Sequence, residues 1–267
     1  MTPELQAQRA SGPVDSFWDR FSGFADAYRR GRPGYPAHLF RALAALAPGR
    51  ELAWDCGTGS GQAAVGLARH FDHVHATDPS ERQIAEAREH ERVAYRVEQA
   101  EKSSLADASV DLVVAAQAMH WFDLDRFYAE AARVLKPGGV LAAFGYDWMY
   151  VSPEIDGAIN ERLLPPLAGH WAPENRLLWD GYRSLRFPGE EMRPGAFAIH
   201  LQWSFEEARA YIESWSAVRD LAAAGGGNKI EAALSVLEAL WGEGRRRIVM
   251  PLHLRVARLG RSGRRGD

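Results

Sequence analysis

The chain has 267 residues, of which 46% are hydrophobic and 25% are charged. This composition is typical of a globular protein and excludes a disordered, collagen-like or disulfide-rich chain. Lys and Arg number 32 against 35 Asp and Glu, which gives a net charge of -3. A charge this small gives the whole protein no general attraction to nucleic acid or to an anionic membrane.

Cysteine content and the absence of targeting signals indicate a cytoplasmic protein. The chain has one cysteine, Cys56, which forms neither an internal disulfide nor a zinc site of the Cys/His type. The N-terminal segment lacks the apolar stretch of a secretory signal, and no run of about 18 apolar residues is present to span a bilayer. We therefore expect a cytoplasmic protein that holds no metal.

Residues 17–47 are predicted to form two helices. In the first, over 17–31, aromatic residues recur three to four positions apart and so share one face. The segment RPGYP (32–36) ends this helix, because proline and glycine do not continue it. A second apolar-periodic stretch predicts a helix over 37–47.

Strands and helices alternate from residue 51 to residue 147. The predicted strands cover 51–55, 73–77, 93–100, 110–118 and 140–146. The predicted helices between them cover 62–71, 81–90 and 123–137. This alternation is typical of an open, mostly parallel sheet with helices on both faces. We expect an α/β fold of the Rossmann-like kind, with about seven strands and a helical lid.

Beyond residue 150 the alternation stops. Residues 151–195 contain short helical fragments separated by prolines, and we expect this insertion to lie over the carboxyl edge of the sheet. The elements predicted after it are a strand at 197–203, a helix at 204–218, a flexible turn at 222–229, a helix at 229–242 and a strand at 248–259.

We expect a single domain over 1–267. Its predicted parts are a core at 48–147, N-terminal lid helices at 17–47, an insertion or lid at 151–195, and C-terminal strands and helices at 196–259.

The main chemical signal is the glycine loop DCGTGSG (55–61), which follows the first predicted strand and precedes a helix. Its three glycines allow a tight turn and a close approach of ligand to backbone. The dinucleotide motif G-x-G-x-x-G is not met, since Gln62 stands where the third glycine is required, and no lysine makes a P-loop. Asp55 would repel a pyrophosphate and favour a ligand with an ammonium group.

A second carboxylate, Asp78, ends the second predicted strand, 21 residues after Gly57. A carboxylate at this place accepts hydrogen bonds from ribose hydroxyls. The same Asp-Pro-Ser sequence also fits an ordinary helix N-cap. A nucleoside that carries an ammonium group and lacks pyrophosphate describes S-adenosylmethionine.

Residues 51–147 resemble the class I S-adenosylmethionine-dependent methyltransferases. The resemblance rests on the glycine loop, Asp78, the QAE triplet (99–101) and KPGG (136–139). The segments 21–36 and 116–139 resemble, more narrowly, a small-molecule subgroup that is similar to trans-aconitate methyltransferase.

This resemblance implies a set of cofactor-binding residues. They are Tyr28, Arg32, Asp55, Gly57, Gly59, Gly61, Asp78, Gln83, Gln99, Ala100, Glu101 and Gln117. Asp78 would bind the ribose, Gln83 would lie along the adenine and Gln117 would lie beside the methionine part. Many relatives have Asp where this chain has Gln99, and a glutamine still accepts a hydrogen bond from the adenine amine.

Three residues near the same edge are candidates for the acceptor pocket. His120 is a candidate general base or substrate-orienting group, because histidine titrates near neutral pH, and a purely structural role is the alternative. The aromatic face of Trp121 would stabilise the positive sulfonium. Trp148 is a further candidate for this pocket.

The expected function is transfer of the methyl group of S-adenosylmethionine to a small molecule by in-line displacement, which leaves S-adenosylhomocysteine. A carboxylic acid is a candidate acceptor, and the acceptor atom (O, N, S or C) stays open. We expect no nucleic-acid or membrane partner, and both a monomer and a homodimer fit. The alternatives are an S-adenosylmethionine-binding sensor or partner protein without turnover, and an NAD-dependent oxidoreductase.

Overall fold

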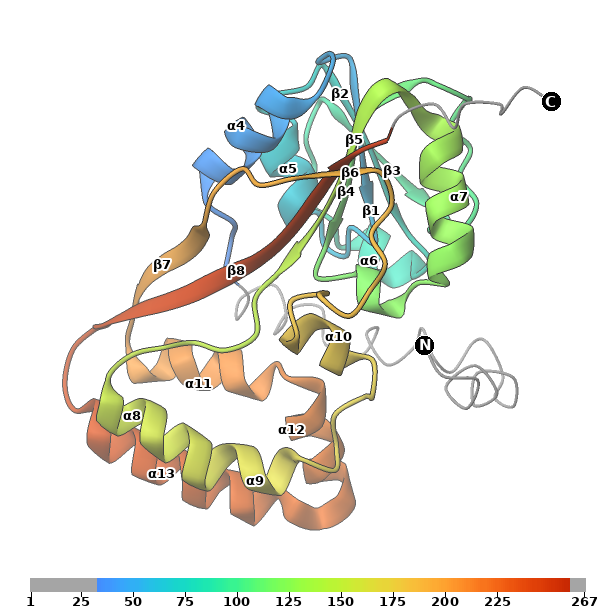
Figure 1. Ribbon diagram of the computed structural model, residues 1–267. Coiled ribbons are helices and arrows are strands. Elements are labelled where there is room, and N and C mark those ends of the chain that lie inside the picture. Colours follow the sequence, from blue (N-terminus) through green and yellow to red (C-terminus); the bar gives the residue numbers. More distant parts are fainter. Residues whose placement is uncertain (1–32, 260–267) are drawn as a thin grey trace.

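The computed structural model describes residues 33–259 (Figure 1). The helix predicted over 17–31, and with it Tyr28, lies outside these residues, as does Arg32. Within 33–259, no helix combines the length and the apolar character that crossing a membrane requires.

The centre of the fold is an open, mostly parallel sheet. Its strands are β1 (Leu52–Cys56), β2 (His73–Asp78), β3 (Val93–Val97), β4 (Val110–Ala116), β5 (Leu135–Gly145), β6 (Glu190–Met192), β7 (Phe197–Trp203) and β8 (Arg246–Arg258). The strand order is β3-β2-β1-β4-β5-β8-β6, with β7 paired to β8. Strands β1 to β5 pair in parallel, whereas β8 is antiparallel to its partners β5, β6 and β7. The expected Rossmann-like α/β sheet is confirmed.

Helices cover both faces of this sheet, because successive side chains of its strands point to opposite sides. In β5, Val140, Ala142 and Phe144 join one hydrophobic cluster and Leu141 and Ala143 join the other. The first cluster lies under α4 (Ala37–Leu46) and α5 (Gln62–Leu67), and the second under α7 (Leu124–Val134). Figure 1 shows these helices on the two sides of the sheet.

A layer of helices lies beyond one end of the sheet, where the long strands β7 and β8 reach it (Figure 1). Its helices are α8 (Pro153–Ala158), η4 (Ile159–Leu163), α9 (Leu164–Leu167), α11 (Phe205–Glu213), α12 (Ser216–Leu221), η5 (Ala222–Gly226) and α13 (Gly227–Trp241). The first two contact α13, and α9 contacts α12. The helices of the proline-rich insertion and of the C-terminal part thus form this layer together.

The remaining helices lie near the carboxyl ends of the strands. They are α6 (Glu81–Ala85), η3 (Met119–Trp121) and α10 (Asn175–Trp179). The contact between α10 and η3 brings the insertion back to the end of β4. The insertion therefore reaches the edge of the sheet where a ligand is expected.

Several predicted boundaries are wrong for identifiable reasons. The turn predicted over 222–229 is shorter than expected: the chain kinks at Gly225, whose φ of 84° is not helical, and helical residues flank this kink on both sides. The helix predicted over 123–137 ends at Val134, because Leu135 already pairs with Val110 in the sheet. The helix predicted over 81–90 ends at Ala85.

The strand order places the site. From β1 the chain continues outward to β2 and β3, and from β4 it continues the other way to β5. At such a switch point the loops that leave neighbouring strands diverge and open a crevice at the carboxyl ends. The segments after β1 and β4 therefore face each other across this crevice.

Candidate functional site

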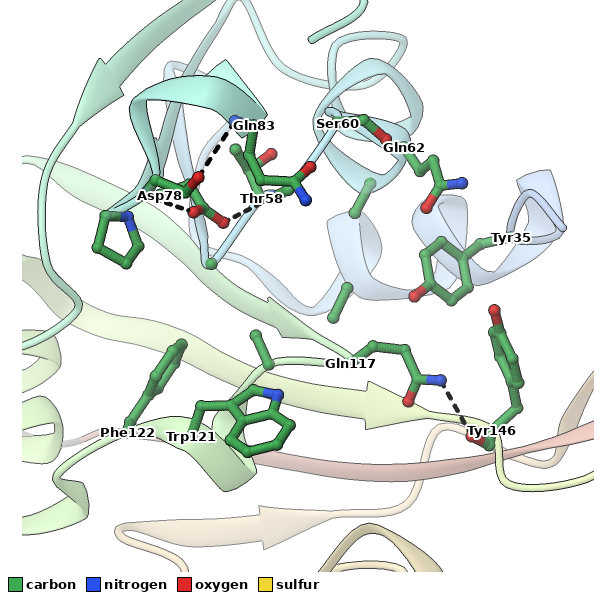
Figure 2. Close-up of a pocket in the computed structure, with 17 residues that line it drawn as sticks. Tyr35, Thr58, Ser60, Gln62, Asp78, Gln83, Gln117, Trp121, Phe122 and Tyr146 are labelled. Atoms are coloured by element: carbon green, nitrogen blue, oxygen red, sulfur yellow. Dashed lines mark hydrogen bonds between the residues drawn. The ribbon is translucent and has the colours of Figure 1, made fainter. Parts of the chain in front are cut away.

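A cavity that opens to solvent lies at the carboxyl ends of β1, β2 and β4. Figure 2 shows the glycine loop, Asp78 and Gln83 on one side and Gln117, Trp121 and Phe122 on the other. Among the predicted cofactor-binding residues, those that line this cavity are Gly57, Gly59, Asp78, Gln83 and Gln117. The topology thus brings residues from three separate loops around one space.

The glycine loop needs its glycines for both conformation and space. Gly57, Gly59 and Gly61 have φ values of 70°, 53° and 81°, in the left-handed region that side chains disfavour. A Cβ atom at Gly57 would lie 2.5 Å from the Cβ of Ala118, and one at Gly61 would lie 2.1 Å from Tyr95 Oη. At these two positions any larger residue would push the loop away from its neighbours.

Asp55 lies beneath the loop, fully buried, and is not among the residues that line the cavity. Its Oδ2 accepts a hydrogen bond of 2.5 Å from Thr58 Oγ1. Burial raises the pKa of Asp55 to about 7, although the hydrogen bonds from Thr58 and the backbone of Ala64 oppose this shift. The loop therefore rests on a carboxyl group that changes charge near neutral pH.

Asp78 holds two loops together at the cavity wall. Its Oδ2 accepts from the backbone N–H of Gly59 and its Oδ1 from that of Ser80, each at 2.9 Å (Figure 2). The N-cap of α6 is Ser80, whose Oγ accepts from the backbone N–H of Gln83. A carboxylate has about four acceptor positions. Two of them therefore remain for hydroxyl groups of a ligand, while burial raises the pKa of Asp78.

Gln117 stands on the opposite wall, directly after β4. Its backbone has a φ of 55°, and its Nε2 donates to the carbonyl of Tyr146 at 3.0 Å. Gln117 Oε1 and Ser60 Oγ are buried and have no hydrogen-bond partner among residues 33–259. Because buried polar atoms are normally satisfied, two such atoms around one cavity indicate a polar ligand.

A second, slightly smaller open cavity adjoins the first and shares Gln117, Trp121 and Tyr146 with it. Besides Trp121, four more indole rings line it, those of Trp148, Trp171, Trp179 and Trp215. Its polar lining residues include His120, Asp147, Asn175 and Arg219. This cavity is therefore aromatic on its walls and polar at a few points.

The tryptophans of the second cavity contact one another as a cluster. The ring of Trp148 stacks on that of Trp179 at 5.6 Å between centroids and meets Trp171 and Trp215 edge-on at 5.8 and 5.7 Å. These rings come from the segment after β5, from the insertion and from the start of α12. Trp148, predicted as a residue of the acceptor pocket, lines this second cavity.

His120 lies in η3, buried, and its ring contacts that of Trp121 at 4.7 Å. Its Nδ1 lies 3.1 Å from the hydroxyl of Tyr182, a residue of the insertion. Burial raises the pKa of Tyr182 far above its ordinary value. His120 and Trp121 both line the second cavity, and Trp121 lines the first as well.

The QAE triplet predicted to bind the cofactor is not part of the described cavity lining. Gln99, Ala100 and Glu101 are absent from the described lining of both cavities. Glu101 Oε1 instead accepts from the backbone N–H of Asp123, at the start of α7. Gln99 forms an isolated bridge with Lys102.

Other lining residues were missed by the sequence reasoning. Two of them adjoin features that the sequence had already indicated. Tyr35 lies in the RPGYP segment, and Tyr146 follows β5 at the carboxyl edge of the sheet. Trp215 lines the second cavity, whereas Tyr182 is in the described lining of neither cavity and contacts His120 instead. Nothing in the local sequence marks either residue.

Known proteins resemble this chain over much of its length. A family model described as a methyltransferase domain matches residues 54–143. A solved structure from Anaeromyxobacter dehalogenans, described as a type II methyltransferase, is 44% identical, covers 85% of this chain and 97% of its own, and has a TM-score of 0.80. A protein of Dictyostelium discoideum described as a methyltransferase is 34% identical over 204 residues, which are 75% of this chain and 78% of that protein.

A third relative is named for its methyl donor. It is a protein of Saccharomyces cerevisiae described as an S-adenosylmethionine-dependent methyltransferase, 30% identical over 136 residues. The match covers 48% of this chain and 45% of the yeast protein.

Proposed function

Since this chain belongs to the class I S-adenosylmethionine-dependent methyltransferases, we propose that it binds S-adenosylmethionine in the larger cavity and methylates a small molecule held in the second. The observation that carries this proposal is that the two cavities adjoin. They share Gln117, Trp121 and Tyr146, so a donor in one and an acceptor in the other would meet at these residues.

The residues of the larger cavity fit the cofactor. Asp78 has acceptor positions left for the two ribose hydroxyls. Ser60 Oγ and Gln117 Oε1 are buried polar atoms that the polar groups of the ligand would satisfy. The backbone of the glycine loop leaves room for close approach. When bound, S-adenosylmethionine supplies a methyl group that its sulfonium has already activated.

The role of the protein in this reaction is to orient the acceptor and to exclude water. The tryptophan walls of the second cavity give an apolar surface, and His120 gives a polar anchor beside the shared residues. Holding two reactants in line replaces a bimolecular encounter and accelerates the reaction strongly. The narrower resemblance to trans-aconitate methyltransferase, with a carboxylic acid as acceptor, stays a prediction.

Calorimetric titration with S-adenosylhomocysteine tests the cofactor. We expect micromolar binding by the parent protein and a loss of at least tenfold in affinity in Asp78→Ala, because the ribose loses its acceptors. The matched control is Asp72→Ala, which removes an exposed carboxylate away from the cavity and should bind like the parent. NADH should give no heat.

Each other outcome has a definite meaning. Absence of binding by S-adenosylhomocysteine would overturn the proposal, and binding of NADH instead would favour the oxidoreductase. With binding established, release of S-adenosylhomocysteine in the presence of acceptor candidates tests turnover. Tight binding without turnover on any acceptor class would favour the sensor.

A further inference from the structure

We propose that Tyr182 locks His120 as its Nε2–H tautomer, and that the tryptophan-walled cavity takes an aromatic acceptor whose negatively charged oxygen is held by this N–H. The choice of acceptor rests on the proposed function, because it assumes methyl transfer at this site. The tautomer of His120 does not depend on that function and is tested separately.

The tautomer follows from where the proton of the Tyr182 hydroxyl points. Tyr182 is fully buried, and among the described residues its hydroxyl has one partner, Nδ1 of His120 at 3.1 Å. Leaving a buried O–H without an acceptor is costly, whereas a hydroxyl oxygen can leave its acceptor positions unused at lower cost. The hydroxyl therefore donates and Nδ1 accepts. The neutral imidazole must then carry its own proton on Nε2.

Tyr182 itself is held firmly from the backbone. Arg255 Nη1 donates to the carbonyl of Tyr182 at 2.5 Å and to that of Leu185 at 2.9 Å. The φ of Tyr182 is 59° and follows a φ of 67° at Gly181, a conformation that the surrounding structure must maintain. Burial keeps the phenol protonated by raising its pKa. Tyr182 is thus a rigid donor that orients the His120 ring.

The orientation of the ring decides what His120 offers to a ligand. His120 lines the second cavity. Its Nδ1 faces Tyr182, and Nε2 is the ring nitrogen on the other side of the imidazole. A nitrogen that carries its own hydrogen donates a hydrogen bond and does not accept a proton. His120 is therefore suited to hold an oxygen acceptor and is unsuited to act as a general base toward an amine or a neutral hydroxyl.

The charges around the cavity agree with an anionic acceptor. Arg219 brings a positive charge to the lining. The carboxylate of Asp147 is already engaged, with Oδ2 3.2 Å from His253 Nε2 and Oδ1 accepting from the backbone N–H of Trp148. Although burial opposes it, these hydrogen bonds lower the pKa of Asp147. Among the lining groups of this cavity, the Arg219 guanidinium and the His120 N–H have the chemistry that suits an oxyanion.

The walls select for a flat ring. Trp148, Trp171 and Trp179 are only partly buried, so part of their indole surface faces the space that they line. Aromatic pairs that stack or meet edge-on are stabilised beyond the burial of their surface. An aromatic acceptor would be stabilised in this way by several tryptophan rings at once, whereas an aliphatic acceptor would not.

The chemistry of this acceptor balances without a base. The oxygen anion gives an electron pair to the methyl carbon, and the carbon–sulfur bond of S-adenosylmethionine breaks with its electrons left on sulfur. The negative charge of the oxygen and the positive charge of the sulfonium are both lost, and no proton has to leave. A carboxylate, or a phenol that is ionised at neutral pH, meets this condition.

Long-range ¹H–¹⁵N NMR of protein labelled with ¹⁵N-histidine tests the tautomer. The signals of His120 are assigned by their absence in His120→Gln. We expect a protonated Nε2 and an unprotonated Nδ1 that accepts a hydrogen bond, and in Tyr182→Phe a mixture of tautomers. A protonated Nδ1 in the parent protein would overturn the assignment, whatever the protein does with S-adenosylmethionine.

Tryptophan fluorescence tests the acceptor class in the presence of saturating S-adenosylhomocysteine. Benzoate-type and acidic phenol probes are titrated beside cyclohexanecarboxylate and benzylamine. We expect the aromatic anions to bind at least tenfold more tightly than either, and Tyr182→Phe to weaken them at least fivefold. Tyr150→Phe, at an exposed tyrosine, is the matched control and should bind like the parent.

The outcomes separate the two proposals. Equal or tighter binding of the amine or of the aliphatic acid, or no binding of any aromatic anion, would overturn the acceptor class. If S-adenosylhomocysteine itself fails to bind, the proposed function fails, while the tautomer of His120 is still decided by the NMR experiment.

Discussion

At the scale of single residues, the site contains two carboxyl groups that differ in their exposure to the cavity. Asp78 faces the cavity and keeps acceptor positions for a ligand, whereas Asp55 is sealed beneath the glycine loop. Burial of Asp55 without a full set of partners favours its neutral form. The two residues are 23 positions apart in the chain, and the parallel pairing of β1 with β2 brings their loops together.

We predict that affinity for S-adenosylmethionine rises with pH between about 5.5 and 7.5. The pKa of Asp55 is about 7 in the folded protein without ligand. A cationic ligand nearby favours the ionised form, so binding below pH 7 releases a proton and becomes easier as pH increases. Calorimetry across this range measures the effect. In Asp55→Asn the dependence should disappear, and a flat profile in the parent would contradict the prediction.

The same shift acts on stability with the opposite sign when no ligand is bound. The folded protein holds the Asp55 proton more tightly than the unfolded chain does. The contribution of this group to the free energy of unfolding therefore falls as pH rises from about 4 to about 7.

We predict that Gly57→Ala abolishes measurable cofactor binding, because the new Cβ would lie 2.5 Å from the Cβ of Ala118. The left-handed backbone alone costs alanine about 1–2 kcal/mol. Gly138→Ala is the matched control, with a φ of 78° and no atom within 4 Å of the new Cβ. It should lose similar stability and keep its affinity for S-adenosylhomocysteine. Equal loss of affinity in both variants would show that the collision is unimportant.

At the scale of elements, one buried carboxylate joins three strands at the end of the sheet away from the site. Asp111 of β4 accepts from the backbone N–H groups of Glu51 and Leu52, and from Lys136 Nζ at 3.0 Å. Its side chain is 1% exposed, whereas that of Lys136 is 25% exposed. This carboxylate therefore fixes the start of β1 against β4 and β5.

We predict that Asp111→Ala lowers the free energy of unfolding by about 3 kcal/mol, because two backbone donors and a partly buried ammonium lose their acceptor. Urea unfolding measures the loss. Asp72→Ala, which removes an exposed carboxylate, should change stability by less than about 0.5 kcal/mol. A loss below about 1 kcal/mol in Asp111→Ala would show that water replaces the missing acceptor.

At the scale of the whole molecule, the helical layer and the sheet share a core. The hydrophobic cluster that contains Phe144 of β5 also contains Leu163 of η4 and Leu234 of α13. The same layer supplies Trp215 to the wall of the second cavity. The walls of the proposed acceptor pocket are therefore supported by the packing of elements from both halves of the chain.

We predict one cooperative unfolding transition, seen alike by tryptophan fluorescence and far-UV circular dichroism. Because the helical layer and the sheet share one hydrophobic cluster, unfolding of the layer would expose the apolar side chains of the sheet. Leu163→Ala should shift both signals together, with a loss of about 2–5 kcal/mol. Leu240→Ala, at an exposed position of α13, is the control and should change little. Two separate transitions would indicate that the helical layer unfolds alone.

Local rules of the chain determined much of this protein. The alternation of strands and helices, the glycine loop and Asp78 were all readable from the sequence, because each depends on residues within one loop or one strand. The rule for parallel sheets predicted a site at the carboxyl edge with His120, Trp121 and Gln117 beside it, and in the structure these residues line the cavities found there.

Only the tertiary structure decided which distant residues complete the site. The hydrogen bond between His120 and Tyr182 joins residues that are 62 positions apart in the chain. The ring of Trp148 contacts that of Trp215, which follows the insertion. Such contacts depend on how the proline-rich insertion and the C-terminal helices pack, and packing of whole elements leaves no local pattern in the sequence. The burial of Asp55 beneath the glycine loop and the hydrogen bond of Glu101 with the start of α7 are likewise contacts that only the folded chain shows.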